Sequence, residues 1–251
     1  MFLEGKRALV TASSRNLGAE IVRALAAEGA SVAVNYHGSR EAANRLIDAL
    51  PGRDRGLHAA VGGDATTPEG VDRVVGDAIT ALGGGIDVLV NNVGPFSMTP
   101  FAEMPLDEWR RIWDANVTSA YVATRAVVPH MRASGWGRIV NLSAGSAWRR
   151  NHSIYTLAKQ AIITLTEALA LELAPEIHVN AVAPGQIVES ADDMAEFDPT
   201  FVERATAATP LGRLATRAEV AGIVVALCGP TFDMVTGVTI PVDGGWRLNR
   251  P

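Results

Sequence analysis

The sequence lacks the features that mark several large classes of protein. Its 251 residues contain a single cysteine, Cys228, in an apolar helical segment, so no disulfide partner or metal-binding cluster accompanies it. No apolar run approaches 18 residues, and the N-terminal MFLEGKRALV is not built like a signal peptide. A net charge of −5 favours neither nucleic acid nor an anionic membrane. We therefore expect a cytoplasmic protein with no metal site, no nucleic-acid partner and no membrane association.

The composition is that of a globular protein with a large core. Hydrophobic residues make up 48% of the chain and charged residues 20%. The sequence has no internal repeat, low-complexity segment or linker, and its length suits one α/β domain spanning residues 1–251.

Short β-rich apolar runs alternate with helical segments along the chain. This alternation predicts a Rossmann-type, doubly wound fold with a seven-stranded parallel sheet covered by helices on both faces. The least regular stretch, residues 188–212, follows a strand, and we expect a substrate lid there, with an ordinary surface loop as the alternative. The expected strands are 6–12, 31–35, 56–61, 87–91, 138–143, 178–183 and 238–242, and the expected helices include 40–50, 68–82, 106–131 (disturbed near its end by Pro129), 154–174 and 217–228.

Tyr155 and Lys159 lie four residues apart in SIYTLAKQAIITLTEALALELA, which predicts a long helix. That spacing places a phenol and an ammonium on one helix face, one turn apart. A phenol has a pKa of about 10, and a neighbouring cation lowers it by stabilising the phenolate. The pair therefore suits proton transfer in alcohol and carbonyl chemistry. The same spacing is common on solvated helix faces, so its meaning depends on the rest of the chain.

The first strand–turn–helix segment has the form of a dinucleotide-binding unit, but its turn is poor in glycine. A G-x-x-x-G-x-G pattern would place glycine at 12, 16 and 18, and only Gly18 is present. Ala12 and Asn16 occupy the other positions, and Asn tolerates a positive φ better than other non-glycine residues. The turn can therefore form and present a helix N-terminus to a pyrophosphate.

Along its whole length the chain resembles the classical short-chain dehydrogenases/reductases, in particular their 3-oxoacyl-carrier-protein reductase-like branch. The matching segments come in that family's order: TASSRNLG (11–18), NNVG (91–94), Asn116 in DANVTSAY, GRIVNLS (137–143), Tyr155-x-x-x-Lys159, VNAVAPG (179–185) and TGVTIPVDGG (236–245).

The resemblance implies a nicotinamide cofactor. No carboxylate occurs in residues 35–40 to repel a 2′-phosphate, and Arg15 and Arg40 add positive charge, so we expect NADP(H). Asn91 matches the motif that supports the sheet. The family often has Thr where this chain has Glu189, and Ser190 could replace that contact. The expected cofactor-binding residues are Ser13, Ser14, Arg15, Asn16, Leu17, Gly18, Asn35, Ser39, Asp64, Ala65, Asn92, Gly94, Tyr155, Lys159, Pro184, Gly185 and Ile187.

The resemblance also implies the catalytic roles. Tyr155 would exchange a proton with the substrate oxygen, Lys159 would lower its pKa and bind the nicotinamide ribose, and Asn116 would hold a water of the proton relay. A family serine follows the fifth strand and orients the substrate. Here the strand register places Ala144 at that position, whereas the family's usual spacing, counted back from Tyr155, places Leu142 there. Ser143 lies between these two positions and is our choice, with Ser146 or no serine as the alternatives.

The substrate is expected to be a ketone or secondary alcohol, either free or attached to a carrier protein. The segment Trp148-Arg149-Arg150-Asn151-His152 either lines its pocket or is a solvated loop. Apolar residues on more than one face of the helices near 107–131 and 154–174 predict a homotetramer. Two other functions remain open: a non-catalytic dinucleotide sensor on the same fold, and an enoyl reductase, which the close Tyr/Lys spacing disfavours.

Overall fold

In the computed structural model, which describes residues 1–97, 99–148, 153–190 and 198–248, seven parallel strands form one sheet. Their order is β3-β2-β1-β4-β5-β6-β7, and every neighbouring pair is parallel. The predicted fold class is thus confirmed. The strands are β1 (Arg7–Val10), β2 (Ser31–Tyr36), β3 (Ala59–Gly62), β4 (Val88–Asn91), β5 (Gly137–Leu142), β6 (Ile177–Pro184) and β7 (Thr239–Val242).

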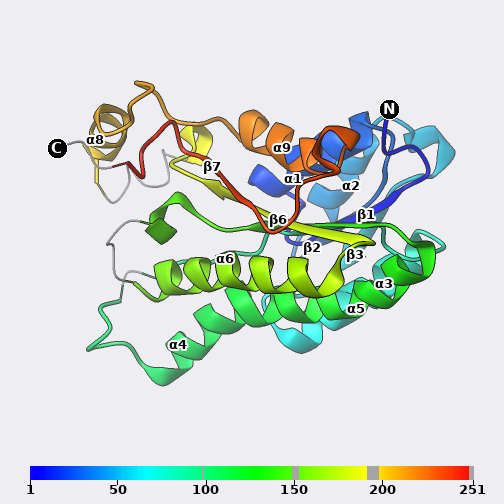
Figure 1. Cartoon of the computed structure of the whole chain (residues 1–251), viewed down its shortest axis with the longest axis horizontal. Coiled ribbons are helices and arrows are strands. Elements are labelled where there is room, and N and C mark those ends of the chain that lie inside the picture. Colours follow the sequence, from blue (N-terminus) through cyan, green and yellow to red (C-terminus); the bar gives the residue numbers. More distant parts are fainter. Residues whose placement is uncertain (98, 149–152, 191–197, 249–251) are drawn as a thin grey trace.

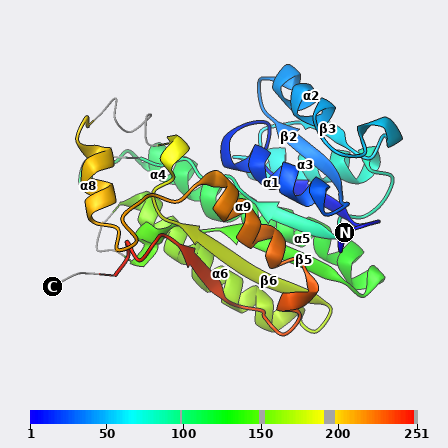
Figure 2. The ribbon, with the colours of Figure 1, turned by 90° about the horizontal axis from the view of Figure 1, so that it is seen from above.

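Helices cover both faces of the sheet, as Figures 1 and 2 show. One face carries α1 (Asn16–Ala27), α2 (Arg40–Asp48) and α9 (Arg217–Ala226). The other carries α3 (Pro68–Ala81), α4 (Leu106–Trp113), α5 (Ser119–Ser134) and α6 (Ile154–Leu173). Because both faces are covered, the central strands read as continuous apolar runs, and all four residues of β4 are buried. Cys228 is buried and its thiol donates to the Val224 carbonyl, as expected of a core residue.

The expected long helix over 106–131 is interrupted in an unexpected place. Residues Asp114–Thr118 form a π-turn between α4 and α5, centred on Asn116. Pro129 does not end α5, which continues to Ser134 and stops at Gly135 with a left-handed φ of 66°. The disturbance therefore lies at Asn116, the expected site residue, and not at the proline, and π-turns are frequent at functional sites.

The carboxyl ends of the strands gather at the left of Figure 1, together with the start of α6. The 3-10 turn η3 (Gly145–Trp148), η4 (Val188–Ser190), α8 (Phe201–Ala207) and the C-terminal segment lie at this edge, whereas the N-terminus lies at the other end. Two further 3-10 turns are η1 (Arg53–Arg55) and η5 (Pro230–Phe232). Parallel sheets bind their ligands at this carboxyl edge.

One helix, α6, is long and apolar enough to meet the criteria for a membrane span by length and composition alone. It lies against the sheet, and 44% of its most apolar window is buried inside this chain. The rest of the helix mixes polar residues, such as Gln160 and Glu167, with the exposed apolar side chains of Leu157 and Leu171.

Candidate active site and cofactor cradle

The turn after β1 has the path that its missing glycines would have taken. Ala12 has a φ of 50° and Asn16 a φ of 53°, and both are exposed. At Gly18 an added Cβ would lie 2.7 Å from the Ala12 carbonyl oxygen, so only glycine fits there. Arg15 is the exposed N-cap of α1, and Ser14 and Leu17 are half-buried. The turn therefore presents open backbone at a helix N-terminus, which fits the pyrophosphate of a dinucleotide.

Hydrogen bonds from buried and half-buried side chains hold this turn in place. Asn35 Oδ1 accepts a 2.8 Å hydrogen bond from the Ala12 amide, and Ser13 Oγ accepts one of 3.0 Å from the Asn35 amide. Asn92 Nδ2 donates to the carbonyls of Thr11 and Ala12, each at 3.1 Å. Ser13 and Asn35 are thus fully engaged inside the protein. Their part in holding a cofactor is to fix the turn.

The edge beyond β2 carries no carboxylate in residues 35–40. Ser39 caps α2 by accepting from the Ala42 amide at 3.2 Å, and Arg40 is exposed beside it. Asp64 lies across from this edge, 3.4 Å from His37 Nδ1. Although burial acts to raise the Asp64 pKa, hydrogen bonds from Thr66 and the nearby His37 hold that pKa below its usual value. Ala65 follows as a buried residue.

Lys159 is buried at the carboxyl edge, with its ammonium held by main-chain oxygens. Nζ donates to the Leu142 carbonyl at 2.8 Å and to the Val93 carbonyl at 3.3 Å. Gly94 passes so close that a Cβ there would lie 2.9 Å from Nζ. Burial lowers the Lys159 pKa to about 7. Its proton therefore exchanges in the physiological range.

Tyr155 lies one turn before Lys159 on α6, with Lys159 Nζ 5.6 Å from the centre of its ring. Burial raises the Tyr155 pKa to about 12. This corrects the expectation that Lys159 lowers it, because burial in the structure outweighs the attraction of a partly neutral lysine. At neutral pH the side chain is a phenol that holds its proton.

Asn116 sits in the π-turn with one half of its amide unpaired. Nδ2 donates to the Ile112 and Pro95 carbonyls, both at 2.9 Å, whereas the buried Oδ1 has no partner among the described residues. A Cβ on Gly94 would lie 3.5 Å from this Oδ1, so the asparagine and Lys159 face the same glycine. A buried acceptor of this kind calls for a hydrogen-bond donor such as a water.

The serines after β5 are arranged differently from our expectation. Ser143 is buried, and its hydroxyl donates at 2.7 Å to the main-chain carbonyl of Lys159. The Ser143 hydroxyl proton is therefore used within the protein. Ala144 follows it, and Ser146 Oγ is buried without a partner in the described part of the chain. Leu142 and Ser143 together hold both the ammonium and the carbonyl of Lys159.

The segment after β6 runs beside the C-terminal region. A Cβ on Gly185 would lie 2.8 Å from Asp243 Cβ, and Ile187 forms an isolated parallel bridge with Ala215. The Glu189 carboxylate accepts from the Arg217 amide at 3.1 Å, and Ser190 Oγ accepts from the Arg217 side chain. Both side chains are therefore used at the start of α9. Pro184 is the last residue of β6.

Within the expected lid, residues 191–197 lie outside the described chain, as do Arg149, Arg150, Asn151 and His152.

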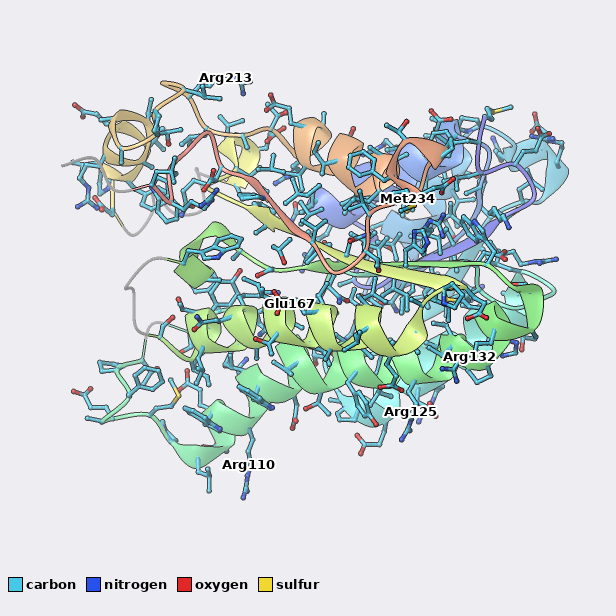
Figure 3. The ribbon with its side chains drawn as sticks, in the orientation of Figure 1. Arg110, Arg125, Arg132, Glu167, Arg213 and Met234 are labelled. Carbon is cyan, nitrogen blue, oxygen red and sulfur yellow. The ribbon has the colours of Figure 1, made fainter. Side chains whose placement is uncertain are left out.

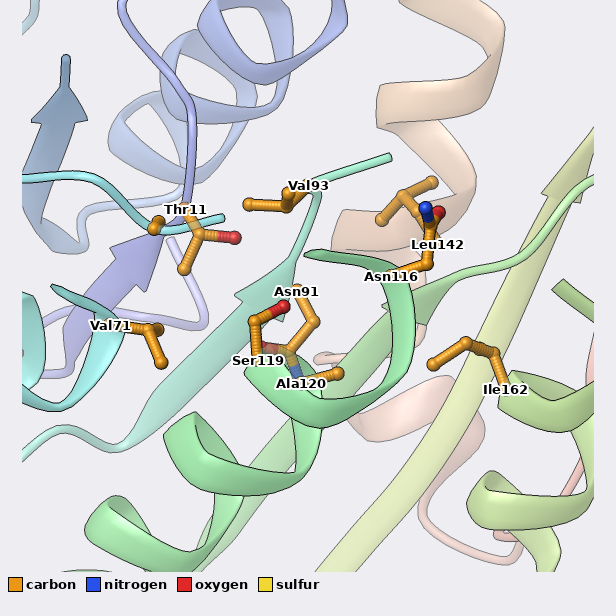
Figure 4. A pocket seen from close by; sticks show the side chains of 10 residues that line it. Thr11, Val71, Asn91, Val93, Asn116, Ser119, Ala120, Leu142 and Ile162 are labelled. Atoms are coloured by element: carbon orange, nitrogen blue, oxygen red, sulfur yellow. The ribbon is translucent and has the colours of Figure 1, made fainter. Parts of the chain in front are cut away.

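Figure 4 shows a crevice under this edge, between β4, the π-turn, β5 and α6. Its walls include Asn91, Val93, Asn116, Leu142 and Ile162, and it has no room for a water molecule. Packed side chains therefore separate the catalytic groups from the core beneath them.

A polar chain missed in the sequence crosses this region. Asn91 Nδ2 donates to Asn141 Oδ1 at 2.8 Å, and Asn141 Nδ2 donates to Thr166 Oγ1 at 3.0 Å. All three are buried, and the chain ties β4 and β5 to α6. An asparagine inside an apolar strand, as in GRIVNLS, is the sequence signal for it.

Comparison with known proteins agrees with this geometry. A family model described as Enoyl-(Acyl carrier protein) reductase matches residues 11–247. The 3-oxoacyl-[acyl-carrier-protein] reductase FabG of Vibrio cholerae is 36% identical over 252 residues, 99% of this chain and 100% of the relative. The structure of a short-chain dehydrogenase/reductase from Serratia marcescens superposes with a TM-score of 0.89 and 33% identity, covering 98% of this chain and 100% of that one.

A blue fluorescent protein from a metagenomic library, solved in complex with NADPH, superposes with a TM-score of 0.87 and 35% identity, covering 98% of this chain and 99% of that one. Together with the sheet order, the cradle and the Tyr155/Lys159 pair, these likenesses establish that the chain belongs to the short-chain dehydrogenase/reductase family.

Proposed function

We propose that this oxidoreductase transfers hydride between NADP(H) and a ketone or secondary alcohol. The observation that carries the proposal is the placement of Tyr155 and Lys159 one turn apart at the carboxyl edge, beside the unpaired Oδ1 of Asn116. A sensor would need the dinucleotide cradle but has no use for a buried lysine whose pKa lies near 7.

Tyr155 is the proposed proton donor to the substrate oxygen. When bound, NADP(H) supplies or accepts the hydride. Because the Tyr155 phenol keeps its proton at neutral pH, it is ready to donate one in the reductive direction. Lys159 and a water bound to Asn116 Oδ1 would then supply a proton to Tyr155. The Ser143 hydroxyl holds Lys159 in position by donating to its main-chain carbonyl. The turn at residues 12–18, Asn92, Gly94 and the segment 184–187 would hold the cofactor.

The preference for NADP(H) rests on charge. The edge beyond β2 lacks a carboxylate, and the side chains of Arg15 and Arg40 are exposed next to it. The NADPH complex of the metagenomic relative supports the same choice. The Arg15→Gln variant loses this positive charge, so the ratio of the NADH dissociation constant to the NADPH dissociation constant should fall. Equal affinities of the native protein for NADH and NADPH would contradict the assignment.

We propose that the substrate bond reduced is C=O and not C=C. The 3-oxoacyl reductase from V. cholerae is named for the former and the family model for the latter. The three-residue gap between Tyr155 and Lys159 supports the carbonyl reaction. A substrate attached to a carrier protein is the alternative to a free carbonyl compound, because both of these names refer to a carrier protein.

A homotetramer remains our proposal for the assembly. Leu171 is 88% exposed on α6 and Tyr121 is 47% exposed on α5. Exposed apolar faces of this kind on adjacent helices mark an interface. Sedimentation should show an assembly larger than a monomer at micromolar concentration, and Leu171→Glu should weaken it.

The decisive assay follows NADPH oxidation with matched panels of ketones and enones. Tyr155→Phe should lower ketone turnover by about 10²-fold or more while NADPH still binds. Tyr121→Phe removes the same hydroxyl from the exposed α5 tyrosine and should leave turnover unchanged. Turnover of enones alone would support the enoyl reductase, and NADPH binding without any turnover would support the sensor.

A further inference from the structure

The carboxyl edge carries an arginine, Arg247, whose side chain donates no hydrogen bond to any described residue, although it lies within ion-pair distance of one carboxylate. Arg247, in the segment after β7, places its guanidinium carbon 5.3 Å above the centre of the Trp148 ring. Trp148 ends η3, between the serines after β5 and the start of α6, and is 40% exposed. The turn η3 and the start of α6, which contains Tyr155, both lie at the carboxyl edge of the sheet (Figure 1).

Packing fixes this C-terminal segment against the proposed substrate side. A Cβ on Gly145 in η3 would lie 3.2 Å from the Pro184 carbonyl oxygen and 3.6 Å from Asp243 Cβ. The Leu211 amide donates to the Gly244 carbonyl at 3.1 Å, which joins the same segment to the chain after α8. Arg247 is thus held between η3, the segment after β6 and the expected lid.

The nearby carboxylate of Asp243 does not use the donors of this guanidinium. Asp243 Oδ1 accepts from the Gly245 amide at 2.9 Å, and Oδ2 accepts from the Arg247 amide at 3.0 Å. Arg247 Nε lies 3.8 Å from Oδ2, too far for a hydrogen bond, and is buried with no partner among the described residues. Asp243 therefore anchors the backbone, and its carboxylate makes only a long ion pair with the guanidinium, which has no hydrogen-bond acceptor among the described residues.

The other described arginines of the lid and tail differ in this respect. Arg213 binds both carboxylate oxygens of Glu219. Arg204 pairs with Asp198, and Arg217 donates to the Glu189 carbonyl and to Ser190. Within the described chain, Arg247 is the arginine of this region whose side chain donates no hydrogen bond. A half-buried, stacked guanidinium with an unused fork matches a planar carboxylate, which it can bind through two parallel hydrogen bonds.

We propose that Arg247, held on Trp148, binds a carboxylate carried by the substrate, so that oxo acids are the preferred substrate class. The inference rests on the proposed carbonyl reduction. The aromatic stack keeps the cation in place before substrate arrives, and the carboxylate would orient the carbonyl group toward Tyr155.

Steady-state kinetics on 2-, 3-, 4- and 5-oxo acids and their methyl esters tests this. For the best acid, Arg247→Gln should raise KM by about 10- to 100-fold with little change in kcat, because an interaction equal in ground and transition states is lost. The esters should be unaffected, and Arg247→Lys should recover only part of the loss. Arg125→Gln is the matched control: Arg125 stacks over an exposed tyrosine at 5.9 Å but lies on α5, away from this edge (Figure 3).

Calorimetry on the Tyr155→Phe variant separates this inference from the function on which it rests. Simple alkanoates should bind it, and binding should vanish in the double variant with Arg247→Gln. If alkanoates bind in an Arg247-dependent manner but the native protein turns over no ketone, the proposed function is contradicted and the carboxylate site is not. The carboxylate site would be overturned if the native protein had equal KM values for the oxo acids and their methyl esters. An unchanged KM for the acids in Arg247→Gln would overturn it as well. Tighter binding of phosphopantetheine than of any alkanoate would show a phosphate site and also overturn it.

Discussion

The carbonyl oxygen of Leu142 accepts a 2.8 Å hydrogen bond from the buried ammonium of Lys159. The strand residue just before Ser143 thus binds the ammonium of Lys159, while the Ser143 hydroxyl binds its main-chain carbonyl. Two carbonyl oxygens, from Leu142 and Val93, compensate only partly for the loss of water around Nζ. Burial of the lysine therefore lowers the stability of the fold, and this cost can be measured.

The first prediction concerns the Lys159 pKa itself. The chain contains two lysines, Lys6 and Lys159, so lysine labelled with ¹³C at Cε should give two titrating NMR signals. One signal should titrate near pH 7, because burial disfavours the ammonium. The Lys6→Arg variant assigns it. A single titration near pH 10 for both signals would refute the buried state of Lys159.

The second prediction is a dependence of stability on pH. Burial lowers the pKa of Lys159 from its ordinary value of 10.5 to about 7, so between these two pH values the unfolded state binds more protons than the folded state. The free energy of unfolding should therefore rise from pH 7 toward pH 10, by at most about 1.4 kcal/mol per pH unit from this group. Tyr155 opposes the trend only above pH 10, since its pKa is raised from 10.0.

Lys159→Met removes that slope and should stabilise the fold at pH 7 and below while abolishing turnover. Chemical denaturation at several pH values measures both slopes. Lys6→Met is the control, because Lys6 packs over the Trp136 ring and should leave the slope as it is. A variant that loses stability at pH 6 would contradict this account.

The third prediction uses the strained turn. Ala12 has a φ of 50°, a conformation that costs a non-glycine residue about 1–2 kcal/mol. Ala12→Gly should raise the free energy of unfolding by up to ~1 kcal/mol, because the strain relieved exceeds the entropy that glycine loses on folding. Ala24→Gly, in the middle of α1, should lower it by about 1 kcal/mol. Thermal and denaturant unfolding compare the two, and equal losses would disprove the strain.

The fourth prediction concerns the hydroxyls after β5. Ser143→Ala removes a buried hydrogen bond to the Lys159 carbonyl and should lower turnover by about 3- to 30-fold, with a shift in the Lys159 titration. Ser146→Ala removes an unpaired hydroxyl and should cost no stability. A loss of about 100-fold in Ser146→Ala, with Ser143→Ala nearly neutral, would instead identify Ser146 as the group that orients the substrate.

Sequence periodicity was sufficient for the fold because each buried strand is a short, uninterrupted apolar run. It also located the turn after β1, since Asn16 tolerates the observed positive φ and Gly18 lacks the Cβ that would clash with the Ala12 carbonyl oxygen. It could not place the hydroxyl of Ser143. Where a strand runs into a 3-10 turn, the direction of the next side chain depends on packing against α6, which lies later in the chain.

Other features depend on contacts between distant segments. The π-turn at Asn116 leaves no mark on helical periodicity, because one extra residue per turn is a small change over a long helix. Glu189 caps the start of α9 from 28 residues away. The stack of Arg247 on Trp148 joins residues almost 100 apart in the chain. Spacing within the sequence carries no information about such pairs.

The placement of the N-terminal segment, far from the carboxyl edge of the sheet, decides how the protein should be tethered. The Leu3 amide donates to the Glu28 carbonyl, and Phe2 packs against Gly229 at the end of the molecule away from that edge (Figure 1). A surface or an affinity tag attached at Met1 therefore leaves the edge at which we propose that substrate binds facing solution. An immobilised enzyme or a biosensor should accordingly be anchored through its first residue.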